Sequence, residues 1–301
     1  MAIVLFFGGN CLFAQKELKP QPEDNFKTYS ELNAALNSKE EVKSISFRMD
    51  ELEFLNPALG ELSALRFLDL KGNSLFHLPS TLGSLKDLES CILSENNMAT
   101  IPSYIQYWEK LTFLQLDDNA IVDLPKEISN LKALEYLELS WNNLSYINNG
   151  LGGLSSLKYL GIENNALYSL PDALNDLEEL EILKLAYNKI NFLPKEIAGL
   201  TSLQSMHLEH NILEEVPKSM GKLKSLKVLD LSYNHLKDLP RSFKKLDELS
   251  SLNLAHNDLK NIPKAIYKMK KLKTLLLIGN EISKEEIDAL KAVRPALTII
   301  N

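Results

Sequence analysis

The sequence holds only two cysteines, Cys11 and Cys91, among 301 residues. A disulfide within the chain would need both, and removal of an N-terminal leader would take Cys11 away. Long hydrophobic runs are also missing, since the longest uncharged apolar stretch covers residues 1–14 and a bilayer span needs about 20 residues. The net charge of −7 disfavours a nucleic-acid partner bound through its phosphates.

The first 14 residues, MAIVLFFGGNCLFA, are typical of the apolar region of a signal peptide. Ala14 supplies the small residue at the cleavage site, and Gln15 would become the new N-terminus. We therefore predict export, to the periplasm, the cell surface or the medium. No Lys or Arg follows Met1, so the alternative is a cytoplasmic protein with an apolar N-terminus.

A repeat of 23 residues fills the chain from Val42 to Asn280 without losing register. Repeats begin at Val42, Leu65, Leu88, Leu111, Leu134, Leu157, Leu180, Leu203, Leu226, Leu249 and Leu272. We number the positions of each repeat as slots from its first residue. In the first ten repeats, slots 1, 4, 6, 11, 14, 18 and 21 are always apolar, which indicates a solenoid.

Each part of the repeat predicts a local structure. Slots 3–5 predict a short parallel strand, and the Asn at slot 9 is expected to bind backbone groups of the turn. Cys91 occupies slot 4, so we expect a small core residue and no reactive thiol. Proline follows slot 14 in eight repeats and suits a segment that leaves the sheet. Asn148-Asn149-Gly150 replaces it in one repeat, where we expect a local loop rearrangement.

Both ends of the repeat array carry a capping-box pattern. Thr28 and Glu31 predict a helix over 29–38, and Ser283 and Glu286 predict one over 284–293. We expect Ile287, Ala289 and Leu290 to face inward and Leu297–Ile300 to add a last strand. The predicted organisation is a signal peptide (1–14), a polar linker and N-terminal cap helix (15–41), repeats (42–282) and a C-terminal cap (283–301), all of one whole protein.

The pattern L-x-x-L-P-x-x-I/L-x-x-L followed by L-x-L-x-x-N resembles the 23-residue class of leucine-rich repeats. That class is shared by bacterial exported proteins, Ras-pathway scaffolds and plant intracellular receptor-like proteins. The resemblance covers residues 42–301 and implies an α/β solenoid, a horseshoe of about eleven repeats with a parallel concave sheet and helical caps. It also implies a scaffold that binds a protein or peptide on the concave face.

Two columns of side chains are candidates for that binding. Slot 3 places aromatic residues in three successive repeats, and slot 8 adds others beside the ladder Asn. The predicted patch consists of Phe113, Tyr136, Tyr159, Trp141 and Tyr187, because exposed aromatic residues dominate binding hot spots. The alternative is structural, since aromatic side chains at slot 8 can simply cover the edge of the strands.

Acidic residues gather in the same repeats and predict a basic partner by charge complementarity. They are Glu89, Glu95, Asp117, Asp118, Glu135 and Glu138, with no Lys or Arg in the same slots of those three repeats. Alternatively, they form an ordinary solvated face. Calcium bound by Glu95, Asp117 and Asp118 is a third alternative, although their spacing follows no known calcium loop.

No pattern indicates catalysis or a resident cofactor or metal. His207, Glu209 and His210 do not form H-E-x-x-H, and no Ser lies in G-x-S-x-G. Gly150-Leu151-Gly152-Gly153 lacks the Lys-Ser/Thr of a phosphate loop. We therefore predict a non-enzymatic scaffold. The alternative is recognition of a glycan or another cell-surface ligand by the same aromatic rings.

Overall fold

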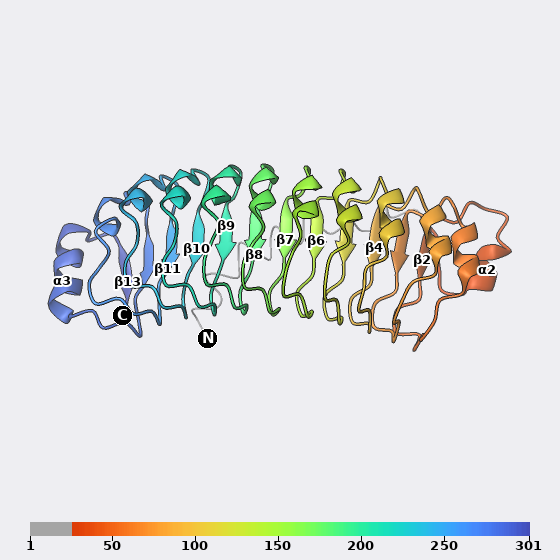
Figure 1. Ribbon diagram of the computed structural model, residues 1–301, viewed down its shortest axis with the longest axis horizontal. Coiled ribbons are helices and arrows are strands. Elements are labelled where there is room, and N and C mark those ends of the chain that lie inside the picture. The colour runs from red at the N-terminus through yellow and green to blue at the C-terminus, as the bar shows by residue number, and fades with distance from the viewer. Residues whose placement is uncertain (1–25) are drawn as a thin grey trace. The chain divides into compact units, whose positions relative to one another are not determined.

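The computed structural model describes residues 26–301. The predicted signal peptide, Cys11 and the linker up to residue 25 lie outside the described residues. The chain divides into two compact units, residues 1–161 and residues 162–301. Figure 1 shows that each unit is built from parallel strands joined through short helical turns.

The first unit contains a parallel sheet whose strands follow the order of the sequence. The strands are β1 (Thr28–Tyr29), β2 (Ser44–Ser46), β3 (Phe67–Asp69), β4 (Ser90–Ile92), β5 (Phe113–Gln115), β6 (Tyr136–Glu138) and β7 (Tyr159–Gly161). One α-helix, α2 (Leu32–Leu36), follows β1. The 3₁₀ turns are η1 (Pro57–Glu61), η2 (Ser80–Ser84), η3 (Ser103–Tyr107), η4 (Lys126–Asn130) and η5 (Asn149–Gly153).

The second unit repeats this plan. Its strands are β8 (Ile182–Lys184), β9 (Ser205–His207), β10 (Val228–Asp230), β11 (Ser251–Asn253), β12 (Thr274–Leu276) and β13 (Thr298–Ile300), again parallel and in sequence order. The 3₁₀ turns are η6 (Asp172–Asp176), η7 (Lys195–Gly199), η8 (Lys218–Lys222), η9 (Arg241–Lys245) and η10 (Ile266–Lys268). The helix α3 (Lys284–Val293) precedes β13.

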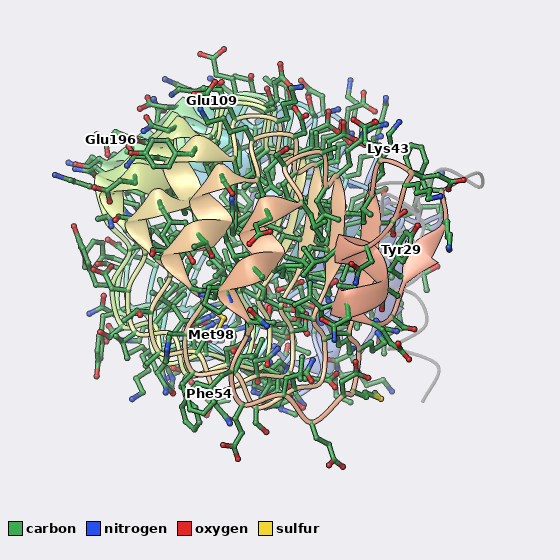
Figure 2. The ribbon with its side chains drawn as sticks, turned by 90° about the vertical axis from the view of Figure 1, so that its right-hand side faces the viewer. Tyr29, Lys43, Phe54, Met98, Glu109 and Glu196 are labelled. Carbon is green, nitrogen blue, oxygen red and sulfur yellow. The ribbon has the colours of Figure 1, made fainter. Side chains whose placement is uncertain are left out.

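The strands of the repeats occupy slots 3–5, as predicted. Register pairs the same slot of adjacent repeats, for example Leu114 with Leu137. Slots 4 and 6 point into the core, where Leu137 and Leu139 are fully buried. In the first unit, the core residue Met98 lies in the interior and Phe54 lies at the outer surface (Figure 2). We call the opposite side of the sheet, which carries slots 3, 5 and 7, the open face.

The ladder asparagines satisfy backbone groups, as predicted. Nδ2 of Asn142 donates to the carbonyl oxygens of Leu116 and Leu139, both at 3.0 Å. Its Oδ1 accepts from the backbone nitrogen of Ile121 at 2.9 Å. Because an amide both donates and accepts, one side chain joins two neighbouring repeats.

The prolines after slot 14 mostly stand at the start of a 3₁₀ turn, as at Pro125 before η4. The predicted loop rearrangement at residues 148–150 is wrong. Asn148 starts η5 in the same way, and its Oδ1 accepts from the backbone nitrogen of Gly150 at 2.8 Å. A hydrogen bond to the capping side chain therefore starts the turn here, where other repeats use the fixed φ angle of proline.

The structure agrees better with the predicted C-terminal helix than with the predicted N-terminal helix. Helix α3 covers the predicted residues, and the Ser283 hydroxyl accepts from the Glu286 backbone nitrogen at 3.3 Å. Glu286 does not complete the capping box, since its Oε1 accepts from the backbone nitrogen of Ile262 at 2.8 Å. Ile287 and Leu290 are buried as predicted, whereas Ala289 is exposed. The last strand, β13, is present.

At the other end, the predicted capping box is wrong. Thr28 belongs to strand β1, and its hydroxyl is hydrogen-bonded to that of Ser44 at 2.9 Å. Helix α2 begins only at Leu32 and has no side-chain cap. Thr28 pairs with the sheet because its backbone extends β2 by one more parallel strand. That both terminal helices cap the solenoid stays a prediction.

Cys91 is fully buried, as predicted, and burial raises the pKa of its thiol above the ordinary range. Trp108 occupies slot 21, one of the seven apolar positions of the repeat. Its indole is almost fully buried and donates from Nε1 to the Leu82 carbonyl oxygen at 2.9 Å. No helix among residues 26–301 is both long and apolar enough to cross a membrane.

Candidate functional site

The slot 3 aromatic residues of the first unit form a stacked column on the open face. The rings of Phe113 and Tyr136 stack with centroids 4.4 Å apart, and those of Tyr136 and Tyr159 at 4.3 Å. All three side chains are at most 2% exposed. The prediction that these rings form an exposed patch is wrong. Parallel strands in register place the same slot of adjacent repeats side by side, so the rings cover one another's faces.

Glu138 lies beside this column and is also buried. Its Oε1 accepts from the backbone nitrogen of Ser140 at 3.0 Å and from the Ser140 hydroxyl at 2.5 Å. Its Oε2 accepts from the Tyr159 hydroxyl at 2.8 Å. Gly161, the neighbouring slot 5 residue, makes room for this carboxylate, because a Cβ atom there would clash with both of its oxygens. Glu138 is thus a satisfied buried acid and not an open acidic contact.

Slot 8 differs from slot 3 because its side chains reach solvent. Trp141 is 62% exposed, and its φ angle of 58° is in the left-handed region. Glycine occupies this slot at Gly72 and Gly279, also with positive φ. A bulky residue rarely adopts this conformation. No ring of the described chain is stacked on the indole of Trp141, which therefore remains available.

In the second unit, slot 8 forms an alternating Tyr and His stack that the sequence prediction did not foresee. Tyr187, His210, Tyr233 and His256 stack in order, with centroids 4.1–4.2 Å apart. Tyr187 is half exposed, and Tyr233 is 45% exposed. The faces within the stack are covered and the ring edges meet solvent. The even spacing of slot 8 in the sequence was the signal that could have revealed this stack.

The predicted acidic surface is largely compensated by neighbouring repeats. Arg66 forms a bidentate pair with Glu89, with N···O distances of 2.8 and 2.7 Å. Lys71 pairs with Glu95 at 2.8 Å, and Lys158 pairs with Glu135 at 2.9 Å. Three of the acids predicted to attract a basic partner are thus already paired within the chain, and a basic partner stays a prediction. In each pair, the basic side chain lies beside the acid on the neighbouring repeat and forms an ion pair with it.

Two other predicted acidic residues keep different environments. Asp117 accepts from the hydroxyl of Ser94 at 2.5 Å and from Nε2 of Gln115 at 2.8 Å. Asp118, at slot 8, is exposed and has a positive φ angle of 54°. Within residues 26–301, no group of three His, Cys, Asp or Glu side chains is arranged to hold a metal ion.

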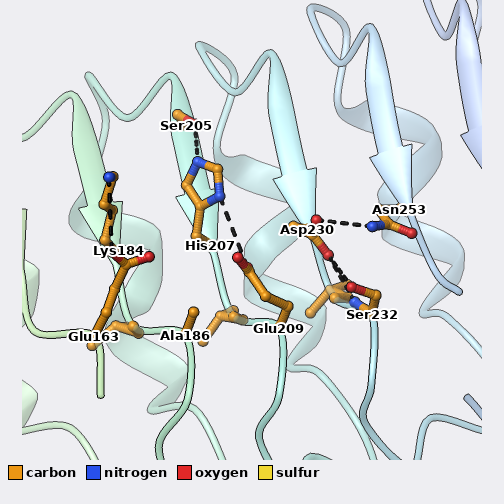
Figure 3. Close-up of polar contacts among 12 residues, drawn as sticks. Glu163, Lys184, Ala186, Ser205, His207, Glu209, Asp230, Ser232 and Asn253 are labelled. Atoms are coloured by element: carbon orange, nitrogen blue, oxygen red, sulfur yellow. Dashed lines mark hydrogen bonds and ion pairs between the residues drawn. The ribbon is translucent and has the colours of Figure 1, made fainter. Parts of the chain in front are cut away.

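A polar cluster in the second unit lies on the open face (Figure 3) and includes His207 and Glu209, which the sequence offered only as an incomplete metal motif. His207 ends strand β9, and Asp230 of β10 is its register partner. Oε2 of Glu209 lies 3.8 Å from Nδ1 of His207. The other ring nitrogen, Nε2, is hydrogen-bonded to the Ser205 hydroxyl at 2.9 Å. We call His207, Glu209 and Asp230 the 207–230 cluster.

Burial sets the protonation of the 207–230 cluster. It lowers the pKa of His207 to about 4, so the imidazole is neutral near pH 7. Burial, with the negative charge of Asp230 beside it, raises the pKa of Glu209 to about 8. Burial also raises the pKa of Asp230, against hydrogen bonds from Ser232 and Asn253. The cluster therefore holds two acids that resist ionisation and no cation of its own.

Comparison with known proteins identifies the family. A family profile described as a leucine-rich repeat region matches residues 53–152 and 142–231, and one described as a leucine-rich repeat matches residues 225–246. The chain therefore belongs to the leucine-rich repeat proteins. A search of curated protein sequences finds no significant match.

Solved structures share the fold. The functional domain of InlJ from Listeria monocytogenes is 19% identical with a TM-score of 0.71, over 86% of this chain and 53% of that one. The plant peptide hormone receptor RGFR1, in complex with RGF2, is 26% identical with a TM-score of 0.65, over 93% and 49%. The ectodomain of the receptor kinase GASSHO1/SCHENGEN3 from Arabidopsis thaliana, in complex with CASPARIAN STRIP INTEGRITY FACTOR 2, is 28% identical with a TM-score of 0.61, over 86% and 35%. This chain thus spans half or less of either plant receptor chain.

Proposed function

We propose that this protein is a non-enzymatic scaffold that binds a protein or peptide partner on the open face of its sheet and the adjoining slot 8 edge. Leucine-rich repeat proteins are typically interaction modules rather than enzymes. Two plant receptors of this fold, at 26% and 28% identity, form complexes with RGF2 and with CASPARIAN STRIP INTEGRITY FACTOR 2. The same use of the repeat surface is what we propose here.

The observation that carries the proposal is the exposure of Trp141. Its indole is 62% exposed, has no stacked ring and stands on a left-handed backbone that costs a non-glycine residue roughly 1–2 kcal/mol. Glycine at the same slot, as at Gly72, avoids that cost. An exposed Trp in a costly conformation adds little to folding, whereas Trp is enriched among residues that dominate binding.

Of the other predicted binding residues, some can contact the partner and the rest stabilise the open face. In the first unit, Asp117 and Asp118 occupy slots 7 and 8 of the repeat before that of Trp141 and supply negative charge near it. In the second unit, Tyr187 offers a half-exposed ring to the partner. Phe113, Tyr136, Tyr159 and Glu138 are buried, so their part is to hold the open face in shape.

Glycan recognition, the alternative, draws less support from this geometry. Sugars stack on the flat faces of aromatic rings. In the slot 3 column and the slot 8 stack, ring centroids are only 4.1–4.4 Å apart, so neighbouring rings already cover those faces. Apart from the indole of Trp141, edges and hydroxyl groups remain, and these suit a polypeptide partner better.

Site-specific photocrosslinking tests the proposal. A photoreactive phenylalanine analogue placed at position 141 should crosslink a host protein in an extract. Phe54 provides the control position, because it is an equally exposed aromatic residue, at 65%, on the loop after slot 11. Capture of one defined protein from position 141 but not from position 54 supports the proposal. Equal capture from both positions, or none from position 141, contradicts it.

Export completes the proposal, with residues 1–14 as the leader. The signal is the uncharged apolar run ending at Ala14. N-terminal sequencing of the protein from its native host should find Gln15 as the first residue. Met1 at the N-terminus would favour the cytoplasmic alternative.

A further inference from the structure

Several acids on or beside the open face pair with a basic side chain of an adjacent repeat, and the acids of the 207–230 cluster differ from them. Lateral ion pairs serve Glu89, Glu95 and Glu135 in the first unit. In the second unit, Glu163 pairs with Lys184 at 3.7 Å. In each of these four pairs the basic side chain belongs to an adjacent repeat. Glu209 and Asp230 lack such a partner among residues 26–301.

Glu209 is the least satisfied acid of this face. Its Oε2 is shielded from solvent and has no hydrogen-bond partner in the described chain. The nearest basic group is Nδ1 of His207 at 3.8 Å, and burial keeps that imidazole neutral near pH 7. Glu138 in the first unit shows the contrast, because three donor groups surround its carboxylate. Oε2 of Glu209 therefore has no donor, and no Lys or Arg of residues 26–301 forms an ion pair with the carboxylate.

Asp230 lies one strand further along and faces the same side. Its Oδ1 accepts from the backbone nitrogen and the hydroxyl of Ser232 at 2.9 and 2.6 Å, and its Oδ2 accepts from Nδ2 of Asn253 at 2.9 Å. These neutral donors fix the carboxylate in position but leave its charge uncompensated. Figure 3 shows both acids on adjacent repeats, with Lys184 directed to Glu163.

From this geometry we propose that Glu209 and Asp230 together bind one basic side chain of the partner polypeptide, a lysine ammonium or an arginine guanidinium. The proposal rests on the proposed function, because the cation is supplied by the bound partner. About a fifth of the Glu209 side chain is exposed, which gives the cation a route to the carboxylate. The partner's basic group would pair with these acids as Lys71 pairs with Glu95 and Lys158 with Glu135 in the first unit.

Binding of a cation here has a proton-linked signature. Burial and the nearby Asp230 raise the pKa of Glu209 to about 8, so its carboxyl is largely protonated at pH 7. A cation in contact stabilises the carboxylate and lowers that pKa, which releases a proton on binding. Non-specific attraction of cations to a protein of net charge −7 produces no such release at one residue.

The test titrates Glu209 in the full chain by carboxyl ¹³C NMR, with Glu209→Gln identifying the signal. Methylguanidinium and methylammonium, each at about 0.1 M, are compared with sodium chloride at the same ionic strength. We expect one of the two organic cations to lower the pKa of Glu209 by about one unit, a tenfold preference for the carboxylate. The more effective cation distinguishes arginine from lysine. Asp230→Asn should reduce the response.

Glu135→Gln is the matched control, because it removes the same charge from an acid already paired with Lys158. This variant should respond as the wild type does. The proposal is overturned if sodium lowers the pKa of Glu209 equally, if neither organic cation lowers it, or if Asp230→Asn changes nothing. Because the probes are small cations, the test can reject cation binding at the 207–230 cluster while position 141 still captures a partner. Conversely, a cation response without any captured partner would overturn the proposed function and leave the cation site standing.

Discussion

The hydroxyl of Tyr159 donates a hydrogen bond to Oε2 of Glu138 at 2.8 Å, across two adjacent strands of the open face. Both side chains are buried, so this contact satisfies a carboxylate that solvent cannot reach. It also anchors the end of the stacked column formed with Tyr136 and Phe113. The pair shows why aromatic and acidic residues that resemble a binding patch in the sequence stabilise the sheet instead.

Tyr159→Phe should therefore destabilise the protein by about 1–3 kcal/mol, because it leaves a buried carboxylate oxygen without its donor. Urea unfolding followed by circular dichroism measures the change. Tyr187→Phe is the control, since its ring is half exposed, and we expect a change within about 0.5 kcal/mol. Equal effects of the two substitutions would show that the Tyr159 hydroxyl contributes nothing special.

The ladder asparagines give a second prediction. Asn142→Ala removes an amide that serves the carbonyl oxygens of Leu116 and Leu139 and the backbone nitrogen of Ile121. The loss of several buried hydrogen bonds should cost about 3 kcal/mol or more. The adjacent Asn143 is exposed, and its side chain has no such role. Asn143→Ala should leave the unfolding midpoint nearly unchanged, and a comparable loss there would contradict this account.

The left-handed backbone at slot 8 gives a third prediction. Trp141→Gly should be more stable than Trp141→Ala by about 1 kcal/mol, because glycine adopts a positive φ without a steric penalty. Thermal unfolding of the two variants measures the difference. A more stable alanine variant would mean that the backbone at residue 141 does not have this conformation in solution.

The pH dependence of stability gives a fourth prediction. The folded-state pKa of Glu209 is raised from 4.5 to about 8, so its contribution to stability is complete below pH 4.5 and is lost as pH rises towards 8. Relative to Glu209→Gln, the wild type should lose about 4 kcal/mol between pH 5 and pH 9. Parallel stability curves for wild type and variant over that range would show that the pKa of Glu209 is ordinary.

The fold followed from the sequence because every repeat encodes the same local choices. Leu at slots 4 and 6, Asn at slot 9 and Pro after slot 14 each have one physical role, and the structure has strands and 3₁₀ turns where the repeat predicts them. Helix α3 was predicted to the residue because Ser283 caps it. The N-terminal helix was misplaced because Thr28 pairs with Ser44 of the sheet, a contact that local sequence does not encode.

The candidate site was harder to predict, because its properties depend on neighbours 21–24 residues away. Phe113 was expected to be exposed, but Tyr136 of the next strand covers one of its faces. Glu89 was expected to attract a basic partner, but Arg66 one repeat earlier is paired with it. The same lateral comparison, made slot by slot along the sequence, could have shown that Glu209 has Asp230 at slot 5 of the next repeat, where Glu163 has Lys184.

The most direct measurement of the central claim is the affinity of Trp141→Gly for the protein captured from position 141. Glycine suits the slot 8 backbone, so a change in affinity reports the lost indole and not a lost fold. We predict that the dissociation constant rises tenfold or more, about 1.4 kcal/mol, while Phe54→Ser leaves it unchanged. An unaltered dissociation constant for Trp141→Gly would contradict the claim that this edge of the repeats binds the partner.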